Sequence, residues 1–340
     1  MSTTSHARAR RRDRRVYLRS HPVLFGLLAA TRGRPVRRLG RTLLVHDADA
    51  YREALTRLPL DRTAAGTTGA AARAALRDGG GVLFDQEGGG HRADRWGLAG
   101  GLGAAGVEEL RARWQPLLVR RLAPLAGGGE VDLVGLAREL SGAVVCALLD
   151  SPADPRAVAE AAAEAAAASV RSHLPGPRRP RAEAAAARAA ERLRRLLGPA
   201  EEALSAMVAV AAVNTTVAAL PRAVAWCADA GLWEQAADEA LRPALAEELL
   251  RVTAASPLLP RVAAADGSVG GCPVRGGDRL LLVARHAAGR TGATRTPGGP
   301  PVRPWPGWCS APDRTRVPGP GWRSSNWPTS WRRWPRTGRW

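Results

Sequence analysis

The stretch Glu247–Ala263, EELLRVTAASPLLPRVA, decides the fold of this 340-residue chain. It begins inside a predicted helix, Leu241–Thr253, in which Glu248 and Arg251 lie three residues apart. Residues at this spacing share one helix face, so the carboxylate and the guanidinium can pair and together hold a third partner. Taken alone, the pattern fits an ordinary surface ion pair better than a functional pair.

The residues that follow change to a period of two. Between 258 and 285 the pattern alternates, and Gly270–Gly271 and Gly276–Gly277 stand where turns are needed. This predicts a small antiparallel sheet. Near the start of the chain, Val36–Val45 predicts a β-hairpin with Gly40 at its turn.

The other segments before residue 290 have helical periodicity. The predicted helices are Asp47–Thr56, Val107–Leu125, Val131–Leu149, two within 155–197 and Ala203–Asp229. The predicted fold class is therefore mainly α with a small antiparallel β part, in a single domain over 35–290. A basic segment, 1–34, precedes this body.

Residues 291–340 have a different composition. They contain no Leu, Ile, Met or Phe, but hold 7 of the 11 Trp of the chain, 10 Pro and 9 Arg. A segment without apolar periodicity cannot offer a continuous face to a core. We expect 291–340 to be a disordered Arg/Trp/Pro-rich tail that is read out of frame.

The net charge of +19 is concentrated at the two ends of the chain. Residues 1–42 carry 12 Arg against one acid, whereas 43–290 carry 29 Arg and 29 acids. A protein that binds a nucleic-acid groove should have a basic face on its folded body. We therefore expect no nucleic-acid partner.

The cysteines and the apolar runs indicate a cytoplasmic protein without a membrane partner. The four cysteines have no C-x-x-C spacing, so they suggest neither a zinc site nor a secreted disulfide framework. The run Val23–Ala30 is too short to span a bilayer. The uncharged run Ala203–Pro221 is rich in Ala and interrupted by polar residues, which favours a buried core helix.

Two further groups of residues carry possible chemistry. His91 and Arg95 lie one helical turn apart, so both could donate to one anion; the alternative is the solvated start of a basic helix. Asn214 and Thr215 lie in the middle of the long apolar helix. Asn can form hydrogen bonds but cannot carry a proton by titration, and Thr can bond back to its own helix.

These groups, in this order along the chain, resemble the cytochrome P-450 family of haem-thiolate monooxygenases. Glu247–Ala263 resembles the family's K helix and the following strand, and the segment 266–290 resembles the stretch before its haem loop. The resemblance implies that His91, Arg95 and Arg261 bind the haem propionates. It also implies that Thr215 and Asn214 lie on the oxygen side and that Glu248 and Arg251 are structural supports.

The resemblance also implies the cofactor and the partners. The cofactor would be haem, iron protoporphyrin IX, and the substrate a small organic molecule. Electrons would come from NAD(P)H through ferredoxin and ferredoxin reductase. The family has Gly and an acid where this chain has Ala212 and Asn214, which puts the usual proton relay in doubt.

The iron ligand of the family is missing. A haem-thiolate enzyme needs a cysteine on the iron, which the family places in F-x-x-G-x-x-x-C-x-G. No such loop occurs here, and no metal ligand can be identified. Read two bases later, Cys309–Arg323 is compatible with Phe-Gly-Ala-Gly-Pro-His-Ala-Cys-Pro-Gly-Ala-Gly-Leu-Ala, and Asn326–Trp334 with a helix. We infer a frameshift near 286–295.

Two other function classes stay open. One is a catalytically inactive relative that serves as a partner or auxiliary protein for another enzyme. The other is a basic protein that binds nucleic acid or a membrane surface through the Arg and Trp side chains of its tail. In every case we expect the chain as written to bind haem poorly and to lack normal activity.

Overall fold

The computed structural model describes residues 3–61, 63–67, 70, 101–173, 180–198 and 202–290. The chain divides into two compact units, and each is described by itself. Among the described residues, the sheet unit contains those up to 70 and from 249, and the helical unit contains 101–248. The predictions for His91, Arg95 and the tail 291–340 lie outside the described residues.

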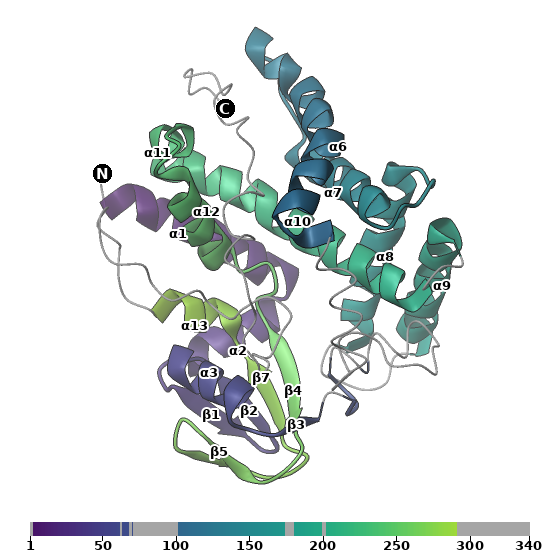
Figure 1. Cartoon of the computed structure of the whole chain (residues 1–340). Helices are drawn as coiled ribbons and strands as arrows, with labels where there is room; N and C mark the ends of the chain where they lie inside the picture. Colours follow the sequence, from purple (N-terminus) through teal and green to yellow (C-terminus); the bar gives the residue numbers. More distant parts are fainter. Residues whose placement is uncertain are drawn as a thin grey trace. The chain divides into compact units, whose positions relative to one another are not determined.

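The sheet unit is built on five strands in the order β1-β2-β7-β4-β3 (Figure 1). The predicted hairpin is confirmed, and Gly40 at its turn has a φ of 57°, which favours glycine. A separate two-stranded ribbon pairs β5 with β6. The strands are β1 Val36–Leu39, β2 Thr42–Val45, β3 Leu60–Asp61, β4 Leu259–Ala263, β5 Gly267–Val269, β6 Cys272–Val274 and β7 Arg279–Leu282.

The sheet differs from the expectation in one respect. The hairpin belongs to the same sheet as β4 and β7, and β2 pairs with β7 in parallel, with Leu44 opposite Leu281. The other ladders are antiparallel. A local alternation pattern cannot show this, because the parallel partners lie more than two hundred residues apart in the sequence.

Helices pack against this sheet. Asp47 caps α3 by accepting hydrogen bonds from the amides of Asp49 (2.9 Å) and Ala50 (3.3 Å). Tyr51 and Leu55 of α3 join Leu43 and Leu280 in one buried cluster. The helices of this unit are α1 Thr3–Ser20, α2 Pro22–Thr31, α3 Ala48–Thr56 and α13 Ala284–Arg290. Helices α1 and α2 were not predicted from the sequence.

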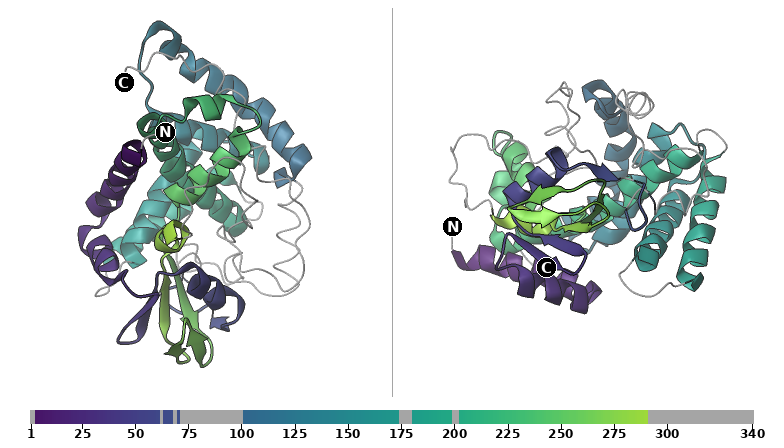
Figure 2. Two further views of the ribbon diagram at one scale, coloured as in Figure 1. Left: turned by 90° about the vertical axis from the view of Figure 1, so that its left-hand side faces the viewer. Right: turned by 90° about the horizontal axis from the view of Figure 1, so that it is seen from below.

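The helices of the helical unit agree closely with the predicted ones. Figure 2 shows them from two further directions. Asp132 caps its helix by accepting from the amide of Val134 at 2.9 Å. The elements are α6 Ala104–Leu122, the 3-10 helix η1 Ala123–Gly127, α7 Leu133–Leu148, α8 Pro155–His173, α9 Pro180–Leu197, α10 Glu202–Ala230 and α11 Trp233–Ala237. Helix α12, Arg242–Thr253, crosses the boundary between the units.

Helix α10 forms the core of the helical unit. Its Met207, Ala209 and Val213 are buried together with Val145 of α7 and Leu193 of α9. By length and composition, Ser205–Ala230 could also cross a membrane, and 39% of its most apolar window is buried. Its packing on α7, α8 and α9 is that of a core helix.

Candidate functional site

The K-helix-like segment is fixed at its end by contacts within the sheet unit. The Tyr17 hydroxyl donates to the carbonyl oxygens of Thr253 (2.6 Å) and Ala254 (3.0 Å), so it binds the carbonyls that the end of α12 leaves open. Arg251 donates from Nη1 to the carbonyl of Ala288 in α13. This contact links the Arg251 side chain to α13. Its role as a structural support stays a prediction.

Glu248 lies on the same helix, three residues before Arg251. Its side chain is exposed, whereas that of Arg251 is half-buried. The two residues are placed as the predicted pattern requires. Their pairing with a third partner stays a prediction.

Arg261 lies on β4, opposite Leu280 of β7. Its guanidinium donates from Nη1 to the carbonyl of Pro260 at 3.0 Å, and the side chain is half-buried. A guanidinium can bind a carboxylate through two parallel hydrogen bonds, so this residue type suits a propionate. The assignment to a haem propionate stays a prediction.

Thr215 and Asn214 lie near the middle of α10 and face different surroundings. Thr215 is buried. Its hydroxyl donates to the carbonyl oxygen of Ala211 at 2.7 Å, and the carbonyl oxygen of Ala212 lies 3.3 Å away. The alternative that Thr215 bonds back to its own helix is thus observed. Its oxygen can still accept a hydrogen bond. Asn214 is exposed.

The described cysteines do not suit an iron ligand. Cys146 and Cys227 are buried on α7 and α10. Burial raises the pKa of Cys227 to about 12, and burial followed by the charge of Asp154 raises the pKa of Cys146. Metal binding requires the thiolate, so both thiols are poor ligands. Cys272 lies in the β5–β6 ribbon with its thiol near the Pro273 carbonyl, 3.8 Å away.

A buried histidine pair was not predicted. Nδ1 of His46 lies 2.9 Å from Nδ1 of His286, and Nε2 of His46 lies 3.1 Å from the hydroxyl of Thr31. Burial, then the charges of His46, Arg32, Arg285 and Arg14, lower the pKa of His286 to about 3. His286 is therefore neutral at pH 7. Its partners lie 240 residues apart, so no sequence signal joins them.

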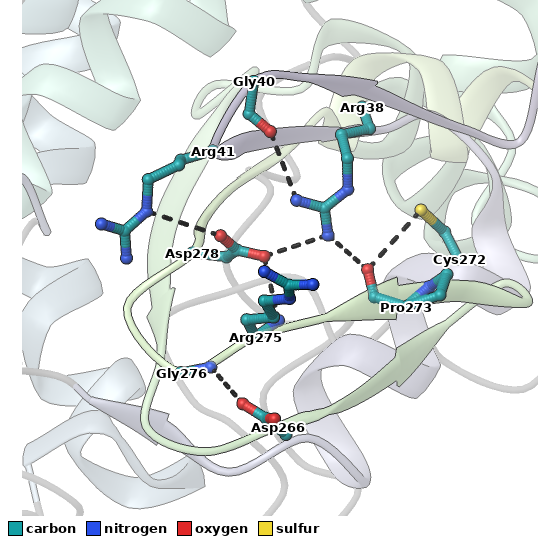
Figure 3. A network of polar contacts seen from close by, with 9 residues as sticks. All are labelled: Arg38, Gly40, Arg41, Asp266, Cys272, Pro273, Arg275, Gly276 and Asp278. Carbon is teal, nitrogen blue, oxygen red and sulfur yellow. Dashed lines mark hydrogen bonds and ion pairs between the residues drawn. The ribbon is translucent and has the colours of Figure 1, made fainter.

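The turn before β7 is closed by a buried carboxylate (Figure 3). Asp278 Oδ2 accepts from the amide of Arg275 (2.9 Å) and from Arg38 Nη2 (3.0 Å), and Arg41 Nε lies 3.8 Å from Oδ1. Arg38 also donates to the Pro273 carbonyl. The amide of Arg275, opposed by burial and aided by Arg38, lowers the pKa of Asp278. These contacts join the hairpin to the segment around β7.

The substitution Asp278→Asn should destabilise the sheet unit by about 1–3 kcal/mol, because hydrogen bonds to a charged acceptor are lost. Since the pKa of Asp278 is lowered in the folded state, its stabilisation exists above the ordinary aspartate pKa and is lost as the pH falls below it. Urea unfolding at pH 7 measures the difference. Asp266→Asn, an exposed carboxylate that accepts from the Gly276 amide, is the control and should change little. Equal effects of both substitutions would contradict this role.

Two clefts occur away from the predicted site residues. The larger one has a volume of 690 Å³ and lies in the helical unit between Arg120, Asp132 and Arg156. The other, of 510 Å³, lies in the sheet unit beside Asp47 and Gly270. Neither of these two clefts is lined by a predicted site residue. Within the described residues, no group of three or more His, Cys, Asp or Glu could hold a metal ion.

The chain is similar in fold to several solved structures, although its sequence matches no known family model. No protein-family model and no curated protein sequence matches the chain. Among solved structures, P450BioI in complex with an acyl carrier protein bearing hexadec-9Z-enoic acid matches with a TM-score of 0.62 and 17% identity, over 80% of this chain and 79% of that one. CYP175A1 from Thermus thermophilus matches with a TM-score of 0.61 and 20% identity, over 80% and 74%. A mutant of P450 EryK with erythromycin B matches with a TM-score of 0.56 and 20% identity, over 79% and 75%.

Proposed function

Because the chain has the cytochrome P450 fold, we propose that its gene encodes a haem-thiolate monooxygenase that inserts one oxygen atom of dioxygen into a small organic substrate. The observation that carries this proposal is the fold match over 80% of the chain. The order of the motifs along the sequence supports it. When bound, haem supplies the oxygen chemistry, and electrons come from NAD(P)H through ferredoxin and ferredoxin reductase. The free cysteines suit the cytoplasm.

The proposal gives each predicted residue one role. Arg261, with His91 and Arg95, binds the haem propionates. Thr215 offers its hydroxyl oxygen on the oxygen side, and Asn214, exposed on α10, stands at the position of the family's acid. Support for these roles comes from the guanidinium of Arg261 on β4 and from the buried hydroxyl of Thr215 on α10. Glu248 and Arg251 hold the end of α12 in place.

The chain as written does not fit the complete cofactor. A thiolate must bind the iron, but the described cysteines are either buried with raised pKa values or set in the β5–β6 ribbon. We therefore propose that this polypeptide binds haem poorly and lacks normal activity. In the shifted reading frame, the haem loop has its cysteine across the codons of Arg316 and Val317. We propose that the frame changes near 286–295.

Spectroscopy of two proteins tests the proposal. The chain as written and a frame-restored chain are purified with haem supplied, reduced and exposed to carbon monoxide. A Soret band near about 450 nm, the signature of thiolate ligation, is expected for the restored chain only. The control is the restored chain with its loop cysteine changed to serine, which should lose the band. A restored chain without the band contradicts the proposal, and so does a band in the chain as written.

A second candidate function follows from the same cysteines. A P450-like protein without an available thiolate can serve as an inactive partner of another enzyme, and the burial of Cys146 and Cys227 on α7 and α10 favours this candidate. Resequencing the gene across 286–295 separates the two. A confirmed present frame, together with stable folding and copurification with a second protein, supports the inactive partner.

A further inference from the structure

The first two helices combine a basic helix with an exposed apolar one. On α1, Ala9, Asp13 and Tyr17 are buried and recur at a spacing of four, so they form one face of the helix. The opposite side carries exposed arginines. They include Arg11, Arg14, Arg15 and Arg19.

Helix α2 is apolar all around. Its Phe25 and Leu28 are buried with Tyr17, Leu44 and Val283 in the core of the sheet unit. Its other face is exposed as well as apolar: Val23 is 86% exposed and Leu27 is 46% exposed. Gly26 and Ala30 share that exposed face, since they follow Val23 by three and seven residues.

Both helices are anchored, so this surface is a fixed feature of the sheet unit. Asp13 forms an ion pair with Arg285, and the Arg285 guanidinium lies 3.9 Å from the centroid of the Tyr17 ring. The Tyr17 and Phe25 rings lie 5.0 Å apart. These contacts turn the arginines of α1 and the apolar face of α2 away from the core.

A soluble helix normally hides its apolar stripe, and a helix that is apolar on all sides requires a partner on each side. Here the exposed stripe is bordered in the sequence by Arg19 on one side and by the exposed Arg32 and Arg34 on the other. Apolar side chains next to arginines match the boundary of a bilayer with anionic headgroups, where hydrocarbon and negative charge lie within a few ångströms.

Although the sequence alone predicted no membrane partner, we propose that α1 and α2 attach this protein to the surface of a bilayer that contains anionic lipid. Val23 and Leu27 enter the boundary between headgroups and acyl chains, and the arginines of α1 contact the headgroups. With ten residues, α2 is too short to span a bilayer, so it lies in the surface. An acidic protein partner would match the arginines, but its hydrated carboxylates would leave Val23 and Leu27 without apolar contacts.

Flotation of the full chain with vesicles tests the proposal, with or without haem. The chain should float with vesicles of phosphatidylglycerol mixed into phosphatidylcholine, and much less with phosphatidylcholine alone. Val23→Gln with Leu27→Gln should lower the partition coefficient at least about ten-fold, since apolar burial is lost. Arg11→Gln with Arg15→Gln should lower it about 25-fold at low salt, roughly five-fold for each arginine.

Matched substitutions elsewhere provide the controls. Val119 and Leu241 are 41% and 42% exposed, so changing both to Gln makes the same chemical change on another surface. Arg57 and Arg113 are exposed arginines that serve in the same way. These controls should float like the original chain, and circular dichroism should show that every variant is folded.

Three results would overturn the proposal. The first is a chain that fails to float with anionic vesicles. The second is flotation that survives the Val23 and Leu27 changes, because charge alone or another segment would then make the contact. The third is absent vesicle binding together with weaker binding of the arginine variant to an acidic ferredoxin, which would make the surface a protein-docking site. None of these results bears on haem binding, so this test and the carbon-monoxide test fail independently.

Discussion

Acidification from pH 6.5 to 4 is expected to destabilise the sheet unit by about 2 kcal/mol through His286 alone. The pKa of this histidine is about 3 in the folded state and ordinarily 6.5, so the unfolded chain binds the additional proton between these values. The contribution of His286 to the free energy of unfolding is then fully present above pH 6.5 and is lost as the pH falls toward 3. The loss is at most about 1.4 kcal/mol per pH unit. Screening by solvent reduces the effect below this limit.

Denaturant unfolding of the original chain and of His286→Asn over this pH range measures the effect. The amide of Asn can still bond to His46 but does not titrate, so the variant should lose most of the slope between pH 6.5 and 4. His6→Asn, a histidine of α1 outside the pair, is the control and should keep the slope. Parallel slopes for the original chain and His286→Asn would contradict the assignment.

The substitution Gly142→Ala is expected to destabilise the helical unit by about 2–3 kcal/mol. Gly142 is buried on α7, where an added Cβ would collide with the carbonyl oxygen of Pro155 and lie 2.8 Å from its carbonyl carbon. Backbone cannot move aside as the end of a side chain can, so α7 and α8 would have to separate. Inserting one methyl group into a close-packed interface costs about 1–3 kcal/mol.

The control substitution for Gly142→Ala is expected to change the stability in the opposite direction. Gly26 lies in α2, and an added Cβ there meets nothing within 4 Å. Gly26→Ala should therefore stabilise its helix by about 0.5–1 kcal/mol, through helix propensity alone. Thermal unfolding of both variants measures the difference. A Gly142→Ala variant as stable as the original chain would show that α7 and α8 tolerate a wider separation.

The helices of the body could be predicted because their signals are local. Asp47 and Asp132 each precede apolar periodicity, and in the structure each caps the helix that follows. The structure confirms the predicted fold class, which is mainly helical. Helices α1 and α2 were missed because a run of arginines next to an unbroken apolar run lacks the alternation that marks a helix buried on one side.

What the sequence could not show are the contacts between distant segments. His46 meets His286, Arg38 meets Asp278, and β2 joins β7 in parallel, each across more than two hundred residues. For the candidate site, the sequence correctly predicted a helix at Arg251, a strand at Arg261 and the long helix at Thr215. It left open the neighbours of Arg251, which proved to include the Ala288 carbonyl in α13.

The parallel ladder between β2 and β7 also sets an order of assembly during translation. The described helical unit is continuous in the sequence, from 101 to 248, so it can fold as soon as it leaves the ribosome. Strand β2 must wait for β7, which is synthesised more than two hundred residues later and lies between β2 and β4 in the sheet. Until then the hairpin exposes an open edge, which is a template for pairing with other chains.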